Sequence, residues 1–127
     1  LKINSLNLQK QIKIFKPIYS ADRLSYIKNC KALLLASDYE CNSMVVAEAL
    51  SLGVLVISSK ECNTEEIAKY GACITIDKNE EVFVKNIKKV FSNDRYKKIQ
   101  KKAKQFSKEF LDLDKNTEKL NNFYLSL

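Results

Sequence analysis

The chain has 127 residues, 46% of them hydrophobic, and a formal net charge of +7. This length suffices to bury one core, which predicts a single domain over residues 1–127 and excludes two complete domains within the chain. The longest apolar runs fall far below the roughly 20 residues that a membrane-spanning helix needs, and no amino-terminal signal pattern is visible.

Two short apolar runs flank a polar loop and a third apolar stretch. Residues 33–36 form a run that is too short for a helix and has polar neighbours, as is typical of a buried strand in a parallel sheet. Residues 37–43 form the loop, and residues 44–52 are apolar nearly all round, which predicts a largely covered helix. Gly53 would end that helix in the left-handed conformation, and residues 54–57 would form the next strand.

This strand, loop, helix and strand predict a ligand site at the carboxyl edge of an α/β sheet. Glu40 lies in the loop, just before a helix amino terminus that favours an anion, and Glu48 lies further along the helix. Carboxylates accept paired hydrogen bonds from vicinal hydroxyls. Two of them beside an anion-binding helix end therefore suit a ligand that carries both sugar and phosphate.

The same residues carry a family resemblance. Ala36 and Ser37 end the strand, seven residues separate Glu40 from Glu48, and an apolar run follows Gly53. This pattern resembles the donor-binding half of the retaining glycosyltransferases of group 1, also called family 4, whose GT-B fold places an E-x7-E motif there. The resemblance implies a Rossmann-like parallel sheet with flanking helices.

The resemblance also implies roles for individual residues. It implies that Glu40 is the catalytic residue and contacts hydroxyls of the transferred sugar. It also implies that Glu48 binds the ribose of the nucleotide. The implied nucleotide-sugar-binding residues are Glu40, Cys41, Asn42, Ser43, Met44, Val45 and Glu48.

One segment departs from the family pattern. Family members usually carry glycine, an aromatic residue and glycine after the first glutamate, where this chain has Cys41, Asn42 and Ser43. Asn42 tolerates a positive φ and Ser43 can cap the helix, so the phosphate site could persist in altered form. In the next loop the family's two glycines and proline are replaced by Glu61, Cys62 and Thr64.

The resemblance extends in both directions along the chain. Residues 62–67 and Gly71 resemble the family segment after the next strand, residues 12–18 resemble the preceding strand, and residues 20–30 resemble the helix between. It implies transfer of a hexose from a nucleoside diphosphate sugar to a hydroxyl acceptor, without a metal or other cofactor. We expect this chain to be the carboxyl-terminal, donor-binding part, truncated at its amino-terminal side, lacking the acceptor-binding domain and inactive alone.

The positive charge is concentrated in a carboxyl-terminal helical segment, residues 81–127. Residues 81–110 hold ten basic and three acidic residues, with apolar residues at helical spacing, which predicts two amphipathic helices broken and capped near residues 92–94. A further packed helix is predicted over residues 115–127. The lysines form either a solvated face or a surface for an anionic membrane, whereas no motif indicates nucleic acid.

Two alternatives to an active enzyme stay open. The lost glycines suggest a catalytically inactive nucleotide-sugar-binding or scaffolding module, and the lysine-rich helices suggest a basic domain that binds a membrane surface. For the enzyme and for both alternatives we expect a cytoplasmic protein, with a peripheral position at the inner face of the membrane as an alternative location.

The cysteines do not indicate a metal site. Cys30, Cys41, Cys62 and Cys73 are widely spaced, and the chain has no C-x-x-C pair and no histidine. A disulfide framework is not expected in such an α/β chain. We therefore predict reduced, mostly buried thiols.

Overall fold

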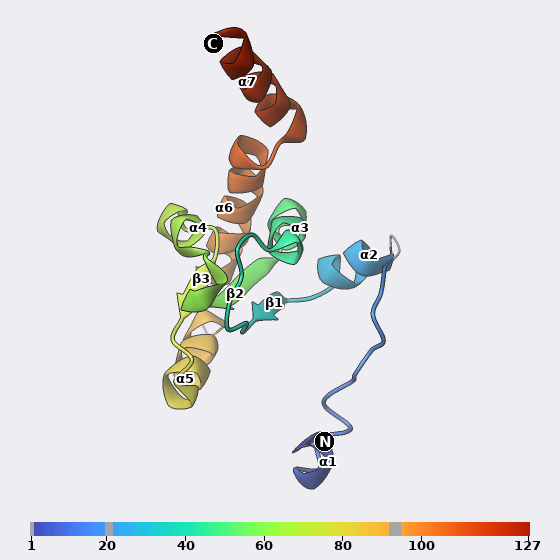
Figure 1. The fold of residues 1–127 in the computed structure, drawn as a ribbon. Coiled ribbons are helices and arrows are strands. Elements are labelled where there is room, and N and C mark those ends of the chain that lie inside the picture. Colours follow the sequence, from blue (N-terminus) through green and yellow to red (C-terminus); the bar gives the residue numbers. More distant parts are fainter. Residues whose placement is uncertain (1, 20–21, 92–94) are drawn as a thin grey trace.

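The computed structural model describes residues 2–19, 22–91 and 95–127 (Figure 1). A parallel sheet of three strands forms its centre, in the order β1-β2-β3: β1 (Ala32–Leu35), β2 (Leu55–Ser59) and β3 (Ile74–Ile76). Between the strands lie α3 (Met44–Leu52), the 3-10 turn η1 (Lys60–Cys62) and α4 (Glu65–Tyr70). The predicted α/β class with a parallel sheet is confirmed.

The remaining helices lie before and after this unit. They are α1 (Lys2–Ser5), α2 (Asp22–Lys28), α5 (Glu80–Phe91), α6 (Arg95–Phe110) and α7 (Leu113–Leu125). In the described part of the chain no helix is both long and apolar enough to cross a membrane.

β2 is the central strand, and all five of its residues are buried. Because side chains alternate along a strand, Val56 belongs to the core on one face of the sheet while Leu55 and Ile57 belong to the core on the other. A strand buried on both faces needs a continuous apolar run, which is why this segment lacks polar alternation.

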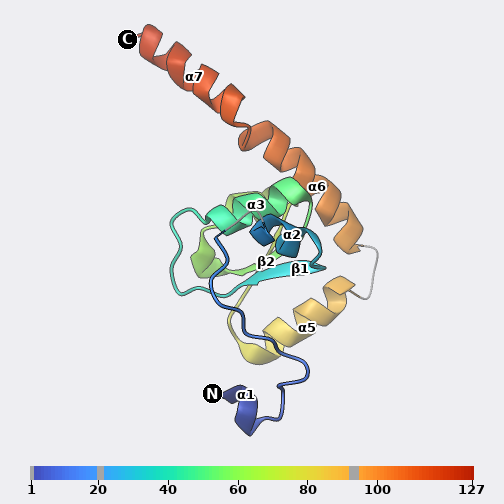
Figure 2. The same cartoon turned by 90° about the vertical axis from the view of Figure 1, so that its right-hand side faces the viewer.

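The two faces of the sheet are covered by different helices (Figure 2). The core on one face joins α2, α3 and the later part of α6, where Ala103 is fully buried. The core on the other face joins α5 and the earlier part of α6, where Ile99 is buried. α6 therefore serves both cores, and it contacts α3, α4, α5 and β2.

Gly53 ends α3 as predicted. Its φ of 70° lies in the left-handed region, and the amide of Val54 returns a hydrogen bond to Ala49 O at 2.8 Å. A Cβ on Gly53 would lie 2.4 Å from Cε and 2.9 Å from Cγ of Lys104 on α6. The glycine thus permits both the tight turn and the close approach of α6.

The strand predicted over residues 12–18 is wrong. These residues have no regular secondary structure, and most of them are exposed. A strand needs a neighbouring edge for its backbone groups, and among the described residues β1 pairs only with β2. The helix predicted over residues 20–30 is present as the shorter α2, and its predicted start lies outside the described residues.

The helices of the carboxyl-terminal segment form, but the last one does not pack as predicted. α7 begins at an N-cap, Asp112, whose side chain accepts a hydrogen bond from the amide of Lys115 at 3.1 Å. None of its residues is buried, and Figure 1 shows it projecting away from the sheet. The predicted break and cap near residues 92–94 lie outside the described residues.

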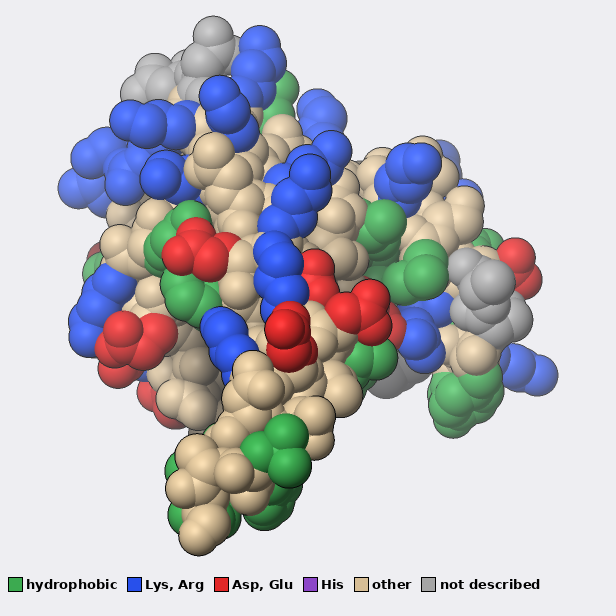
Figure 3. All heavy atoms as spheres, turned by 90° about the horizontal axis from the view of Figure 1, so that it is seen from above, with side chains coloured by type: hydrophobic (Ala, Val, Ile, Leu, Met, Phe, Trp, Pro, Cys, Tyr) green, Lys and Arg blue, Asp and Glu red, His purple; other side chains and the backbone are tan. Residues whose placement is uncertain are grey.

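Basic side chains collect on the face seen from above in Figure 3. α6 carries seven basic residues and a single acidic one, Glu109. Its apolar face supplies Ile99 and Ala103 to the two cores, so the helix is amphipathic, as predicted.

The thiols are divided between surface and interior. Cys62 and Cys73 are buried, whereas Cys30 and Cys41 are exposed, and all four are free. The prediction of mostly buried thiols therefore holds for only two of them. Burial raises the pKa of the Cys73 thiol to about 11.

Replacing Gly53 with alanine tests the contact between the α3 turn and α6. We expect Gly53→Ala to lower the free energy of unfolding by more than the roughly 1–2 kcal/mol of left-handed strain, because the added Cβ also displaces Lys104. Gly71→Ala is the matched control, since Gly71 has φ 85° but nothing within 4 Å of such a Cβ. The measurement is urea unfolding. An equal loss in the free energy of unfolding in the two variants would contradict the close approach of α6.

Candidate functional site

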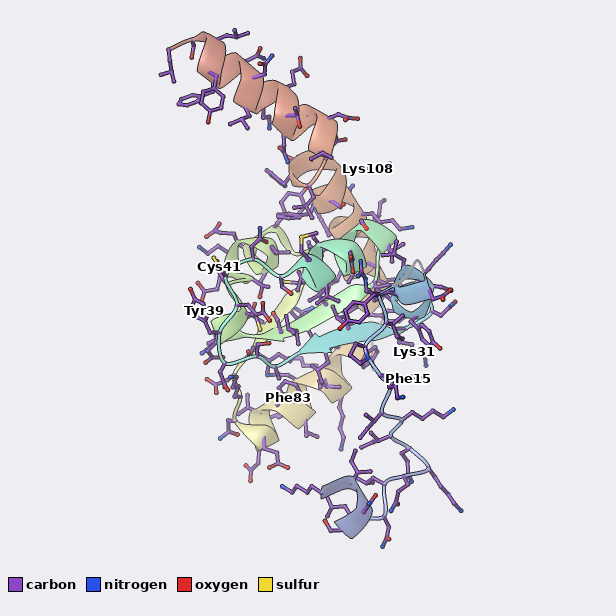
Figure 4. The ribbon with its side chains drawn as sticks, turned by 45° about the vertical axis from the view of Figure 1, so that its right-hand side comes forward. Phe15, Lys31, Tyr39, Cys41, Phe83 and Lys108 are labelled. Carbon is purple, nitrogen blue, oxygen red and sulfur yellow. The ribbon has the colours of Figure 1, made fainter. Side chains whose placement is uncertain are left out.

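The loops that leave the three strands meet at the carboxyl edge of the sheet. Figure 4 places Tyr39 and Cys41, from the loop after β1, at the opposite end of the sheet from Lys31, which precedes β1. The turn after β2 lies at the same edge, because parallel strands end on the same side. The predicted location of the site is therefore the place where these loops gather.

Buried hydroxyls at the end of β2 connect this strand to the loops. Ser58 and Thr64 share a hydrogen bond of 2.5 Å between their hydroxyl oxygens, and Ser59 Oγ donates to Ser37 O at 2.9 Å. Ser58, Ser59 and Thr64 are all essentially inaccessible to solvent. Because a buried hydroxyl without a partner is costly, these bonds hold both loops in fixed positions.

Two further hydrogen bonds join the loop after β1 to the turn after β2. The amide of Glu40 donates to Glu61 O at 3.1 Å, and Asn63 Nδ2 donates to Cys41 O at 2.9 Å. Asn63 adopts φ 52°, whereas Asn42 does not have a positive φ. The left-handed asparagine of this edge is therefore in the second loop, not in the segment that replaces the family's glycines.

Glu40 is held at this edge by its own loop as well. Its Oε1 accepts a hydrogen bond from Ser37 Oγ at 3.0 Å, and the side chain is partly exposed. Sequence reasoning placed Ser37 at the end of the strand. The structure gives it a role there, because its hydroxyl orients the carboxylate of Glu40.

The amino terminus of α3 opens toward the same edge. Ser43 is the N-cap, and its carbonyl accepts hydrogen bonds from the amides of Val46 and Ala47 at 3.1 and 3.2 Å. Ser43 is therefore the cap residue that the sequence indicated, but it caps through its backbone, because its hydroxyl makes no capping bond. The amides of Met44 and Val45 have no acceptor within the helix, and Met44 is 71% exposed.

Glu48 lies one turn into α3 and has a partner that the sequence did not reveal. Its Oε1 accepts a hydrogen bond from Arg23 Nη2 of α2 at 2.5 Å, forming an ion pair. No interaction between the described residues joins Glu48 to Glu40. The two carboxylates are thus held separately, one by the loops and one by α2.

Lys78, which follows β3, offsets the negative charge of acidic residues in the two loops. Its Nζ lies 2.5 Å from Asp38 Oδ1 and 3.7 Å from Glu61 Oε2. The hydrogen bond and charge of Lys78 lower the pKa of Asp38, and the Asp38 hydrogen bond raises the pKa of Lys78. Glu61, an acid where the family has glycine, therefore has a nearby cation.

The site is an open edge rather than an enclosed cavity. A pocket between Asn42, Ser43, Asn63 and Leu111 has a volume of only about 40 Å³, far below the roughly 300 Å³ or more of a small-molecule pocket. A larger hollow of about 580 Å³ lies between residues 15–18 and α2, and none of the predicted site residues lines it.

Sequence reasoning missed Arg23 and the buried serines. Arg23 is one of only two arginines among 22 basic residues, and that rarity was the available signal, because arginine is suited to pairing with carboxylates. Ser58 and Ser59 end an apolar run, and both belong to the buried strand β2 rather than to the loop that follows it.

Comparison with known proteins agrees with this geometry. A family model described as glycosyl transferases group 1 matches residues 1–109. No curated protein matches the chain. Among solved structures, the chain is similar to WaaG, a glycosyltransferase involved in lipopolysaccharide biosynthesis, with a TM-score of 0.68 and 17% sequence identity.

The structural match covers 83% of this chain and 29% of the WaaG chain. At this identity it shows a shared fold. It confirms the Rossmann-like α/β fold of the GT-B type that the resemblance implied, and the chain spans less than a third of the solved protein it matches.

Proposed function

The chain belongs to the group 1 glycosyltransferases, and from this premise we propose that it binds the nucleoside diphosphate sugar of a retaining hexosyltransferase. The acceptor would be a hydroxyl of a glycan or lipid-linked saccharide, bound by a further domain. The involvement of the structurally similar WaaG in lipopolysaccharide biosynthesis supports this class of acceptor.

The observation that carries the proposal is the placement of two carboxylates around the α3 amino terminus. Glu40 precedes this terminus and is fixed by Ser37 and by the backbone of Glu61. Glu48 follows it on the same helix. The amides of Met44 and Val45 lie between them in sequence and are available to an anion.

Each group then has a distinct role in donor binding. The helix amides bind the diphosphate, and they stabilise the negative charge that develops on it when the sugar leaves. Glu48 accepts hydrogen bonds from the ribose hydroxyls, and Glu40 accepts hydrogen bonds from the transferred hexose. No cofactor is proposed.

Affinity measurements on two variants separate these roles. We expect Glu48→Ala to weaken binding of UDP, ADP or GDP and of the matching glucose derivative alike, by about ten- to hundredfold, because each hydrogen bond to a charged group contributes about 1.5–3 kcal/mol. Glu40→Ala should weaken binding of the sugar nucleotide and leave the affinity for the nucleoside diphosphate unchanged. Isothermal titration calorimetry measures both.

Glu66→Ala is the matched control, since Glu66 is an exposed glutamate paired with Lys69 on α4. Its affinities should equal those of the wild type. If Glu48→Ala and Glu66→Ala bind the nucleotides with the same affinity, the assignment of Glu48 to the donor is wrong. Donor binding without sugar transfer by the complete protein would favour the inactive module that the altered Cys41 segment suggests.

A second candidate function rests on the outer face of α6. Lys97, Lys101, Lys104 and Lys108, here called the lysine stripe, follow one another at helical spacing, so they share one face of the helix. This face is opposite Ile99 and Ala103 and extends for about 16 Å. We propose that the lysine stripe attracts an anionic membrane surface, where lipid-linked acceptors would be located.

The composition of the stripe favours lipid over nucleic acid. It contains lysines alone, without the arginine and aromatic side chains that read or stack on bases. A straight row of point charges on one helix face suits a flat surface of phosphate headgroups, to which each lysine adds about 1 kcal/mol.

Vesicle co-sedimentation tests this surface. We expect binding to vesicles with about 30% anionic phospholipid, weakening with salt, and at least a roughly tenfold loss in Lys101→Gln/Lys104→Gln/Lys108→Gln. The matched control replaces Lys85, Lys88 and Lys89 of α5 in the same way. Equal losses in the two triple variants, or retention on RNA but not on vesicles, would contradict a membrane role for the stripe.

A further inference from the structure

We propose that Arg23 is a positioning residue for the nucleotide, acting through Glu48. This inference rests on the proposed function, because it concerns how the chain prepares one carboxylate for the ribose. The bond that carries it joins Arg23 Nη2 of α2 to Glu48 Oε1 of α3 at 2.5 Å.

The geometry of the pair leaves room for a ligand. Arg23 engages a single oxygen of Glu48 through a single nitrogen, and Oε2 of Glu48 has no partner among the described residues. A carboxylate has about four lone-pair sites. Glu48 can therefore keep its bond to Arg23 and still accept hydrogen bonds from two vicinal hydroxyls.

The surroundings of the pair fix its position. The Glu48 side chain is only 17% exposed, whereas that of Arg23 is 44% exposed. α2 is anchored against α3 by Ile27, which is buried in the same core as Val46. Arg23 thus extends from a docked helix, and Glu48 is held before any ligand arrives.

Because Glu48 is already held in place, its side chain loses less conformational entropy when the ligand binds. Immobilising a flexible side chain costs affinity, and the cost corresponds to about two- to tenfold in the dissociation constant. We expect Arg23→Met, which keeps the apolar stem and removes the charge, to weaken nucleotide binding by this factor.

The end-on contact predicts rescue by lysine. A lysine can form the same single bond to one carboxylate oxygen, although it cannot reproduce a two-pronged contact with phosphate. Arg23→Lys should therefore retain most of the affinity if Arg23 acts through Glu48. If Arg23 instead made a direct bidentate contact with the diphosphate, Arg23→Lys would bind the nucleotide as weakly as Arg23→Met.

The experiment is a double-mutant cycle measured by calorimetry with UDP, ADP and GDP and their 2′-deoxy forms. Arg23→Met should weaken binding of the ribonucleotide, should weaken binding of the 2′-deoxy form less because only the 3′-hydroxyl remains, and should cause no further loss of affinity in a Glu48→Ala background, which removes the acceptor of Arg23. Lys28→Met, on the same helix, controls for the loss of one positive charge and should leave affinity unchanged.

The outcomes distinguish this inference from the function on which it rests. If the wild type binds a nucleotide and Arg23→Met binds it equally well, or if the loss of affinity persists in the Glu48→Ala background, the positioning role is wrong and the proposed function stands. If the folded wild type binds none of the three nucleotides, the proposed function fails and the inference fails with it.

Discussion

The candidate site depends on a desolvation constraint at the end of β2. Ser58 and Ser59 belong to a strand that is buried on both faces, so their hydroxyls must find partners inside the protein. The partners are Thr64 in the next loop and the carbonyl of Ser37 in the previous one. The central strand thereby fixes the two loops that carry Glu40, Cys41 and Asn63.

This constraint explains how the loop can differ from the family pattern and still be ordered. The bonds that hold this loop use the amide of Glu40 and the carbonyl of Cys41, backbone groups that any residue other than proline supplies. Asn63 takes the left-handed conformation in the opposite loop. The side chains of Cys41 and Asn42 are exposed, so they change what a ligand would meet more than they change the backbone.

Local signals in the sequence predicted part of this arrangement. Helix α3 has the predicted bounds, because the apolar stretch and Gly53 define it without reference to distant residues. The segment over residues 12–18 shows the opposite case, since its apolar character did not make it a strand, and it does not pair with the open edge of β1. The pairing of Arg23 with Glu48 spans 25 positions and depends on how two helices dock, which no spacing rule contains.

The central claim is that the carboxyl edge of this sheet binds the nucleotide of a sugar donor, and an amide NMR titration of the chain with UDP, ADP and GDP tests it most directly. We predict that one nucleotide shifts amides clustered at residues 37–48 and 61–64, with Met44 and Val45 among the largest changes. A well-dispersed spectrum with no shifts, or with shifts confined to α6, would contradict the claim.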